Sequence, residues 1–198
     1  NLRKQVENIR KFNLPVLVAI NKFSADTAAE IHELEDMCRS QSIDVVLNEC
    51  WEKGGEGGIE MAERLVEIVR SGAGEYKPLY GLNDSLQQKV ETIAQSIYGA
   101  DSVVFSVQAR KEIKKLEKYG YDKLPVCMAK TQYSLSDDPD LLGEPKGFKI
   151  TVKDVRVSAG AGFVVCLTGD IMTMPGLPKI PAANVMDIDQ DGKITGLF

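Results

Sequence analysis

The stretch "PVLVAINKFSADTAAEIHELEDMCRSQSIDVVLN" (residues 15–48) decides the fold class, because two short apolar runs flank one amphipathic segment. The run at 15–20 is continuously apolar, which is typical of parallel strands buried on both faces, and "IDVVLN" at 43–48 is predicted to be a second buried strand. Between them, Thr27 and Glu30 have the capping-box spacing of a helix N-terminus. The stretch therefore predicts a strand–helix–strand unit with a parallel sheet.

The neighbouring segments continue this alternation. Residues 2–12 have a helical pattern, and a glycine-rich loop carrying the only tryptophan, Trp51, follows the second strand. The next segment (59–71) has apolar residues at helical spacing on one face. Residues 1–71 are therefore predicted to form the edge of a mostly parallel, doubly wound α/β sheet of the P-loop NTPase-like kind.

After residue 72 the pattern changes to that of a smaller, mixed α+β portion, which we expect to extend over 72–198. Its predicted helices, strands and hairpin are defined by amphipathic spacing, short apolar runs and a glycine turn. The helices are expected over 86–97 and 108–119, the strands over 102–107 and 124–129, and the hairpin turns at Gly160–Gly162.

Composition excludes several classes of function. The 198 residues carry a net charge of −5 with both signs interspersed, which argues against nucleic-acid and membrane partners. No apolar run approaches the length of a membrane span. Cys38, Cys50, Cys127 and Cys166 are scattered, as expected of reduced core cysteines in a cytoplasmic protein. With His32 as the only histidine, no metal site is expected.

Two motifs suggest nucleotide binding, and both are incomplete. A Walker-type phosphate loop needs G-x-x-x-x-G-K-[ST], whereas Gly58 is followed by no lysine and Glu56 places a negative charge inside the loop. "INKFSAD" resembles the guanine-reading N-K-x-D box, but Ser24 stands at the aspartate position and Asp26 comes two residues late. A GTPase-like nucleotide-binding domain is kept as an alternative.

An aromatic clamp is the second interpretation of the glycine-rich loop. Phe23 and Trp51 each follow a predicted parallel strand, and open α/β sheets bind ligands at the carboxyl ends of their strands. Two such rings could hold a flat heteroaromatic ligand between them, with the glycines leaving room beside the indole. The competing interpretation is that both rings simply pack under loops.

Two further segments are candidate sites. "DIDQDGKITGLF" (187–198) imitates a calcium loop, but Phe198 occupies the position of the bidentate carboxylate. A D-G turn joining two terminal strands explains it better. "KTQYSLSDD" (130–138) is a polar loop after a strand, either a site wall or a hydrogen-bonded surface loop.

Taken together, these segments resemble one family, formate–tetrahydrofolate ligase, also called 10-formyltetrahydrofolate synthetase. The chain resembles the carboxyl-terminal portion of the enzyme, and the bacterial single-function form is the closer likeness. The chain also opens on Asn1 in the middle of a helical pattern, which we interpret as a fragment of something longer. The matching stretches are "PVLVAINKFSADT", "WEKGGEGG", "IYGAD", "LPVCMAKTQYSLSDD", "ITVKDVRVSAGAGF", "TGDIMTMPGLPK" and "DGKITGLF".

The resemblance implies an ATP-dependent ligase that makes formyl phosphate from formate and transfers the formyl group to N10 of tetrahydrofolate. ATP with Mg would be the co-substrate and tetrahydrofolate the substrate, with no cofactor held tightly by this part. The family's phosphate- and formate-binding residues are expected upstream of Asn1, so the 198 residues alone are expected to be inactive. The family also implies a homo-oligomer, specifically a homotetramer, in the cytoplasm. A non-catalytic oligomerisation module remains a further alternative.

The resemblance also implies site residues. In the family the pterin ring stacks between a Phe and a Trp, whose matching positions are Phe23 and Trp51, and Leu47 matches a neighbouring wall residue. We further expect the rigid loop "MTMPGLP" (172–178) to form a wall of a shared nucleotide and folate cleft, or else a buried connection. The residues expected to line that wall are Met172, Met174, Pro175, Gly176 and Pro178.

Overall fold

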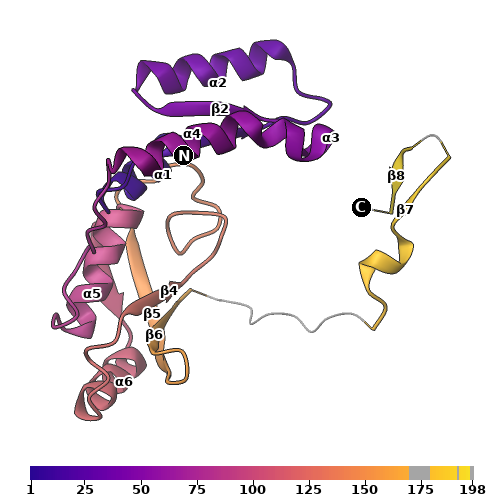
Figure 1. Ribbon diagram of the computed structural model, residues 1–198. Coiled ribbons are helices and arrows are strands. Elements are labelled where there is room, and N and C mark those ends of the chain that lie inside the picture. The colour runs from indigo at the N-terminus through magenta and orange to yellow at the C-terminus, as the bar shows by residue number, and fades with distance from the viewer. Residues whose placement is uncertain (170–178, 191, 197–198) are drawn as a thin grey trace.

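The computed structural model describes residues 1–169, 179–190 and 192–196. The helices and strands form two layered regions, one on a parallel pair of strands and one on a four-stranded mixed sheet. A short two-stranded hairpin near the carboxyl terminus lies apart from both (Figure 1). The α/β class predicted from the sequence is confirmed.

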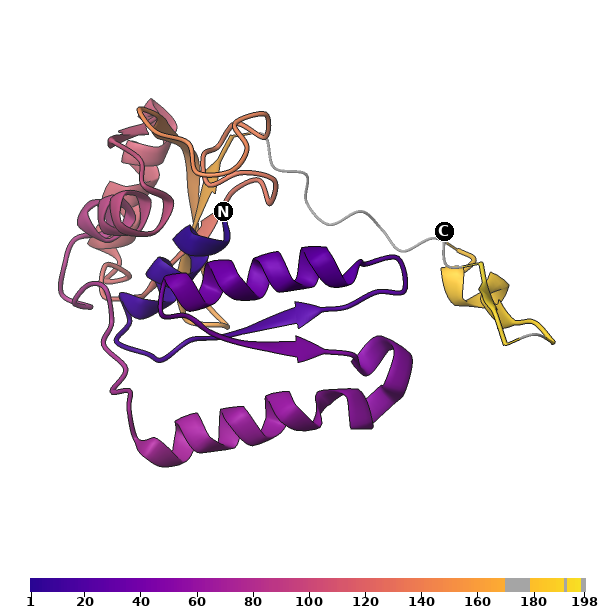
Figure 2. The same cartoon turned by 90° about the horizontal axis from the view of Figure 1, so that it is seen from above.

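The first region is the predicted strand–helix–strand unit. β1 (Leu17–Asn21) and β2 (Asp44–Asn48) pair in parallel. α2 (Ala28–Ser40) lies on one face of the pair and α4 (Ile59–Ser71) on the other (Figure 2). In the part of the chain that the structure describes, no third strand joins this sheet, so the larger P-loop-like sheet is not seen.

Local chemistry explains where α2 begins. The Thr27 hydroxyl accepts a hydrogen bond from the Glu30 backbone N–H at 3.3 Å, and the Glu30 carboxylate accepts one from the Thr27 N–H at 2.9 Å. This reciprocal pair satisfies two backbone donors that a helix N-terminus would otherwise leave unpaired. The predicted capping box is confirmed.

The core of the first region is small. α1 (Leu2–Arg10) contributes Val6, which packs with Cys38 and Ile43 in one buried cluster. The apolar stripe of α4 was expected to close this core, but Ile59 is 54% exposed, Val69 is 72% exposed and no residue of the helix is buried. The helix forms as predicted, whereas its apolar stripe faces outward within the described residues.

The second region is a mixed sheet with strand order β3-β5-β6-β4. β3 pairs with β5 and β4 with β6 in parallel, while β5 and β6 form the predicted antiparallel hairpin. α5 and α6 pack against this sheet. The bounds are β3 Ser102–Phe105, β4 Val126–Ala129, β5 Lys149–Ser158, β6 Phe163–Thr168, α5 Leu86–Ile93 and α6 Val107–Lys118.

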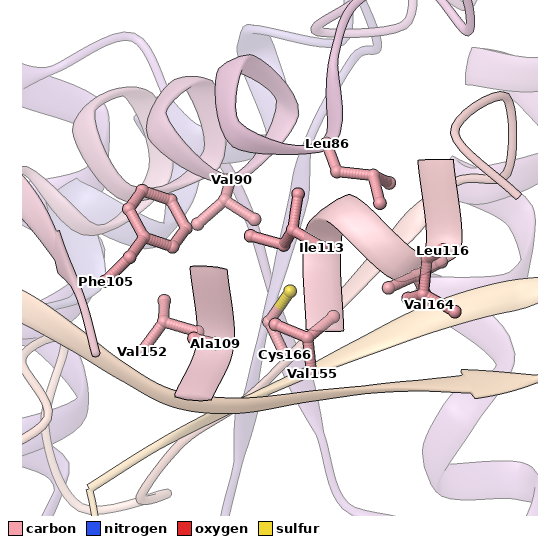
Figure 3. Packing of buried hydrophobic residues seen from close by; sticks show 10 residues of the cluster. All are labelled: Leu86, Val90, Phe105, Ala109, Ile113, Leu116, Val152, Val155, Val164 and Cys166. Carbon is pink, nitrogen blue, oxygen red and sulfur yellow. The ribbon is translucent and has the colours of Figure 1, made fainter. Parts of the chain in front are cut away.

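This sheet and its helices enclose the main hydrophobic core. Side chains from α5 and α6 point toward those of β5 and β6 and interlock with them (Figure 3). The buried members of this cluster are Leu86, Val90, Phe105, Ala109, Ile113, Leu116, Val152, Val155, Val164 and Cys166.

A lysine is buried beside this core. Lys89 of α5 has no exposed surface, and burial lowers the pKa of its ammonium group. Its Nζ donates hydrogen bonds to the backbone carbonyls of Leu82, Asp122 and Leu124, at 2.7, 2.6 and 3.1 Å. Three acceptors satisfy all three of its protons, which offsets much of the cost of burying the charge.

The remaining elements are short. α3 (Cys50–Lys53) and a 3₁₀ turn (Gly54–Gly58) lead into α4, and a π-helical turn (Ala94–Tyr98) ends the segment predicted as a helix over 86–97. A 3₁₀ turn (Ala182–Val185) precedes the terminal hairpin.

The terminal hairpin consists of β7 (Asp187–Ile188) and β8 (Ile194–Thr195), which pair antiparallel and confirm the predicted turn between two strands. The Asp189 carboxylate accepts a hydrogen bond from the Lys193 N–H at 2.8 Å, so it helps to close this turn. None of the described helices is long and apolar enough to cross a membrane. The expected cleft wall at 172–178 lies outside the described residues.

Candidate functional site

The carboxyl ends of β1 and β2 bring two aromatic side chains together. Phe23 follows β1 and Trp51 lies on α3, directly after β2. Their ring centroids are 5.9 Å apart and their planes are inclined by 55°. Phe23 is 51% exposed and Trp51 is 58% exposed. Rings packed under loops would be largely covered, so these two side chains are not simply buried under loops.

The pair is closed upon itself in this conformation. A flat ring held between two others needs about 7 Å between their planes, twice the contact distance of about 3.5 Å. A centroid distance of 5.9 Å with tilted planes leaves no such gap. Because both side chains are half exposed, rotation about their side-chain torsions can open the pair without moving the backbone.

The glycine-rich loop holds the start of α3 by close backbone contact. The Glu49 N–H donates to the Gly57 carbonyl at 3.0 Å, and a Cβ on Gly57 would lie 2.4 Å from the Glu49 carbonyl group. A Cβ on Gly58 would lie 2.7 Å from the Cys50 sulfur. Gly54 and Gly55 have open space around them. Two of the glycines are thus required by packing, and two leave space.

An ion-pair network ties the two strand ends together. The Glu49 carboxylate accepts hydrogen bonds from Lys22 Nζ at 2.8 Å and from Lys53 Nζ at 2.6 Å. These two ammonium groups hold the pKa of Glu49 down at about 2, so it remains ionised. Lys22 directly precedes Phe23, while Glu49 stands two residues before Trp51. The network therefore links the two segments that carry the rings, and we expect it to help set their spacing.

Sequence reasoning missed Glu49. The Glu49–Lys53 spacing of four residues was a visible signal, because such pairs lie on one side of a helical turn. The partnership with Lys22 could be found only from the register of β1 and β2, in which Asn21 lies opposite Asn48.

The residues of the N-K-x-D-like motif have structural roles here. The Asn21 side-chain oxygen accepts a hydrogen bond from the Asn48 side-chain amide at 2.7 Å. The Asp26 carboxylate accepts one from the Phe23 backbone N–H at 2.8 Å and so shapes the turn after β1. With Lys22 paired to Glu49, these groups already have partners and are not arranged to read a guanine base.

Leu47 lies beside the aromatic pair rather than between its rings. It lines a hollow of about 440 Å³ between β2 and the start of α2, together with Lys22, Asp26 and Ile31. Neither Phe23 nor Trp51 lines this hollow. The structure therefore brings Phe23 and Trp51 into contact and places Leu47 in the adjoining depression.

The polar loop at 130–138 is held by its own hydrogen bonds. Ser134 and Ser136 are buried, their hydroxyls are 2.9 Å apart, and the Ser136 hydroxyl donates to the Asp138 carbonyl at 2.8 Å. Lys130 Nζ donates to the carbonyls of Thr131 and Ser134. These contacts agree with a hydrogen-bonded loop.

Across residues 1–169, 179–190 and 192–196, no group of three or more His, Cys, Asp or Glu side chains could hold a metal ion.

Comparison with models of known protein families gives a match over residues 1–198 to the family described as formate–tetrahydrofolate ligase. The match covers both layered regions and the terminal hairpin. It agrees with the likeness carried by the sequence segments around Phe23 and Trp51. Enzymes of this family are ATP-dependent ligases that act on formate and tetrahydrofolate.

Proposed function

Because the chain belongs to the formate–tetrahydrofolate ligase family, we propose that Phe23 and Trp51 hold the pterin ring of tetrahydrofolate between them. The observation that carries this proposal is a pair of half-exposed aromatic rings at the ends of adjacent parallel strands. That edge of an open α/β sheet is where ligands bind. The role of this chain is then to bind and orient the folate in the ligase reaction.

The physical chemistry of the pair suits a pterin. Each stacked aromatic face contributes about 0.5–1.5 kcal/mol beyond the area it buries. Two faces can therefore fix the plane of the ring, while rotation within that plane is left to polar contacts. Leu47 offers an apolar wall in the adjoining hollow, on the side of α2. Orienting the ring also helps to orient N10, which must attack the carbonyl carbon of the formyl group so that phosphate leaves.

The direct test is Trp51→Ala in the active ligase. We expect the folate KM to rise by the equivalent of about 1–3 kcal/mol, because one stacking face is lost. The KM values for ATP and formate should stay unchanged, since the indole meets only the pterin. Steady-state kinetics with each substrate varied in turn measures the three values.

Two variants control this experiment. Trp51→Phe keeps a flat ring and should recover most of the folate affinity. Tyr119→Ala removes another exposed aromatic ring, at the end of α6, and should change none of the three KM values. A folded Trp51→Ala enzyme with the wild-type folate KM would refute the clamp.

A further inference from the structure

A second hollow lies in the other region of the molecule. It has a volume of about 690 Å³ and is bounded by the connection at 76–82, by α5 with its π-helical turn, and by β4. Phe12, just after α1, completes its wall. Small-molecule sites in proteins usually measure about 300–1,000 Å³, so this cavity has the size of a ligand site. Neither Phe23 nor Trp51 lines it.

The walls of the cavity are apolar and partly flat. Four of the lining side chains are aromatic, namely Phe12, Tyr76, Tyr80 and Tyr98. The rings of Phe12 and Tyr76 stack with planes inclined by only 8° and centroids 5.9 Å apart. Among the described residues that line the cavity, none has a charged side chain. A charged ligand would lose its hydration without a partner here, so these walls favour an uncharged one.

One polar group identifies the kind of contact that such a ligand could make. The Tyr80 hydroxyl oxygen accepts a hydrogen bond from the Val126 backbone N–H at 3.0 Å. Within the described part of the chain its own proton has no acceptor. A lining hydroxyl with a proton to donate suits a ligand that carries a hydrogen-bond acceptor.

The same hydrogen bond argues for a small molecule rather than a peptide. β4 is an edge strand of the four-stranded sheet, and edge strands attract extended peptides through their free backbone groups. The Tyr80 hydroxyl already occupies the Val126 N–H on this short strand. An added strand would have to displace it.

We propose that this cavity is a second ligand site, which takes an uncharged, flat, ring-containing molecule with one hydrogen-bond acceptor. The ligand lies against the aromatic wall of Phe12 and Tyr76 and accepts a hydrogen bond from Tyr80. This site is separate from the folate clamp and does not depend on the function proposed for it.

Prodan, a neutral naphthalene dye with one carbonyl acceptor, is a suitable probe. We expect saturable binding to one site per chain, with the blue shift of a dye that leaves water. Cys127 lines the cavity and is exposed, so bound dye should slow its alkylation by N-ethylmaleimide at least tenfold. Mass spectrometry of the labelled peptides measures this rate.

Cys50 is the matched thiol for this measurement. It is exposed on α3, outside the cavity, so its alkylation should keep the same rate with and without the dye. Cys38 and Cys166 are buried, and burial raises the pKa of the Cys166 thiol to about 12, so neither should compete for the reagent.

A pair of charge-insertion variants provides a second measurement. Leu82 lines the cavity and is 56% exposed, so the fold should tolerate Leu82→Arg while dye affinity falls at least tenfold. Leu142→Arg changes another exposed leucine, outside the cavity, and should leave dye affinity unchanged. Three results would each overturn the proposal: no saturable binding, equal protection of Cys127 and Cys50, or displacement of the dye by tetrahydrofolate.

Discussion

The two regions of this molecule differ in how completely they are packed. In the first region a single buried cluster holds Val6, Cys38 and Ile43, and α4 buries none of its residues. In the second, ten buried residues join two helices to a four-stranded sheet. The candidate folate site lies on the sparsely packed region, whereas most of the hydrophobic stabilisation lies in the other. Ligand-binding segments are often drawn from the less stable parts of a protein.

Buried polar groups show the same contrast. In the second region, Lys89 is fully buried and donates three hydrogen bonds. In the first region, Asn8 of α1 is 5% exposed, and neither atom of its side-chain amide has a hydrogen-bond partner within the described residues. An unpaired buried amide costs about 1–3 kcal/mol. The first region therefore contains an unpaired buried polar group in addition to its smaller hydrophobic core.

The largest effect that would test this comparison comes from shortening one isoleucine in each region. Ile113→Ala on α6 should destabilise the protein by about 2–5 kcal/mol, since the side chain is 2% exposed and its removal leaves a cavity. Ile59→Ala on α4 makes the same change on an exposed helical face. It should change the free energy of unfolding by less than about 0.5 kcal/mol. Urea unfolding followed by circular dichroism measures both. Equal losses would show that α4 is as well packed as α6.

The second-largest effect concerns the glycine-rich loop of the first region. Gly57→Ala places a methyl group 2.4 Å from the Glu49 carbonyl and should cost about 1–3 kcal/mol of local stability. Gly55→Ala, two residues away in open space, should cost less than about 0.5 kcal/mol. Because Trp51 is the only tryptophan, its fluorescence reports on this loop. Identical spectra for the two variants would contradict the close approach.

The sequence predicted most of the secondary structure, because that structure depends on local chemistry. The capping box of Thr27 and Glu30, the strands β1 and β2 and the glycine turn between β5 and β6 were all predicted, whereas the capping box at Ser85 was not. The prediction that four scattered cysteines are core residues is only half right: Cys38 and Cys166 are buried, but Cys50 and Cys127 are exposed. Exposure depends on what packs over a residue from distant parts of the chain, and a spacing rule does not contain that information.

The candidate site was predicted in part for the same reason. Phe23 and Trp51 could be placed together, because parallel strands end at the same edge of their sheet. The contacts near the two rings could not be predicted from the sequence, since the pairing of Lys22 with Glu49 depends on strand register and on side-chain direction. The outward-facing stripe of α4 was likewise beyond the sequence, because periodicity reveals an apolar face without showing what covers it.

Removing a helix cap should give a smaller effect, which tests whether the two regions unfold separately. Thr27 caps α2 in the first region and Ser85 caps α5 in the second, each in a complete capping box. Replacing either by Ala should cost about 1 kcal/mol. For Ser85→Ala the loss should appear in global unfolding, because Leu86 and Val90 anchor α5 in the main core. For Thr27→Ala it should appear as local opening of α2.

Native-state hydrogen exchange separates these two outcomes. Thr27→Ala should speed amide exchange within α2 and leave the amides of β5 and β6 unchanged. Ser85→Ala should speed exchange at β5 and β6 as well. If both variants speed exchange throughout the chain, the two regions unfold as one unit.

The smallest expected effect is that of Glu49→Gln, and it is distinguished by its dependence on pH. Lys22 and Lys53 lower the pKa of Glu49 to about 2, below its ordinary value of 4.5, so the folded state favours the ionised carboxylate. The stabilisation by this network is complete above the ordinary value and is lost as the pH falls from about 4.5 toward 2. Trp51 fluorescence should therefore change over that range in the wild type, and Glu49→Gln should lack the transition. At neutral pH the variant should weaken folate binding by no more than about fivefold, because Lys22 and Lys53 are 32% and 51% exposed and ion pairs with such solvated groups contribute little.

Glu144 supplies the matched control for this titration, because the two regions each contain one such carboxylate. Lys146 and Arg3 lower the pKa of Glu144 to about 2 as well, and its side chain is about as covered as that of Glu49, with 20% and 19% exposed. The side-chain partners of Glu144 are Arg3 and Lys146, and neither lies in the loops that carry Phe23 and Trp51. Glu144→Gln should therefore keep the acid transition of Trp51 fluorescence that Glu49→Gln abolishes. If Glu144→Gln removes the transition too, the signal reports general acid unfolding, and Glu49 does not set the spacing of the aromatic pair.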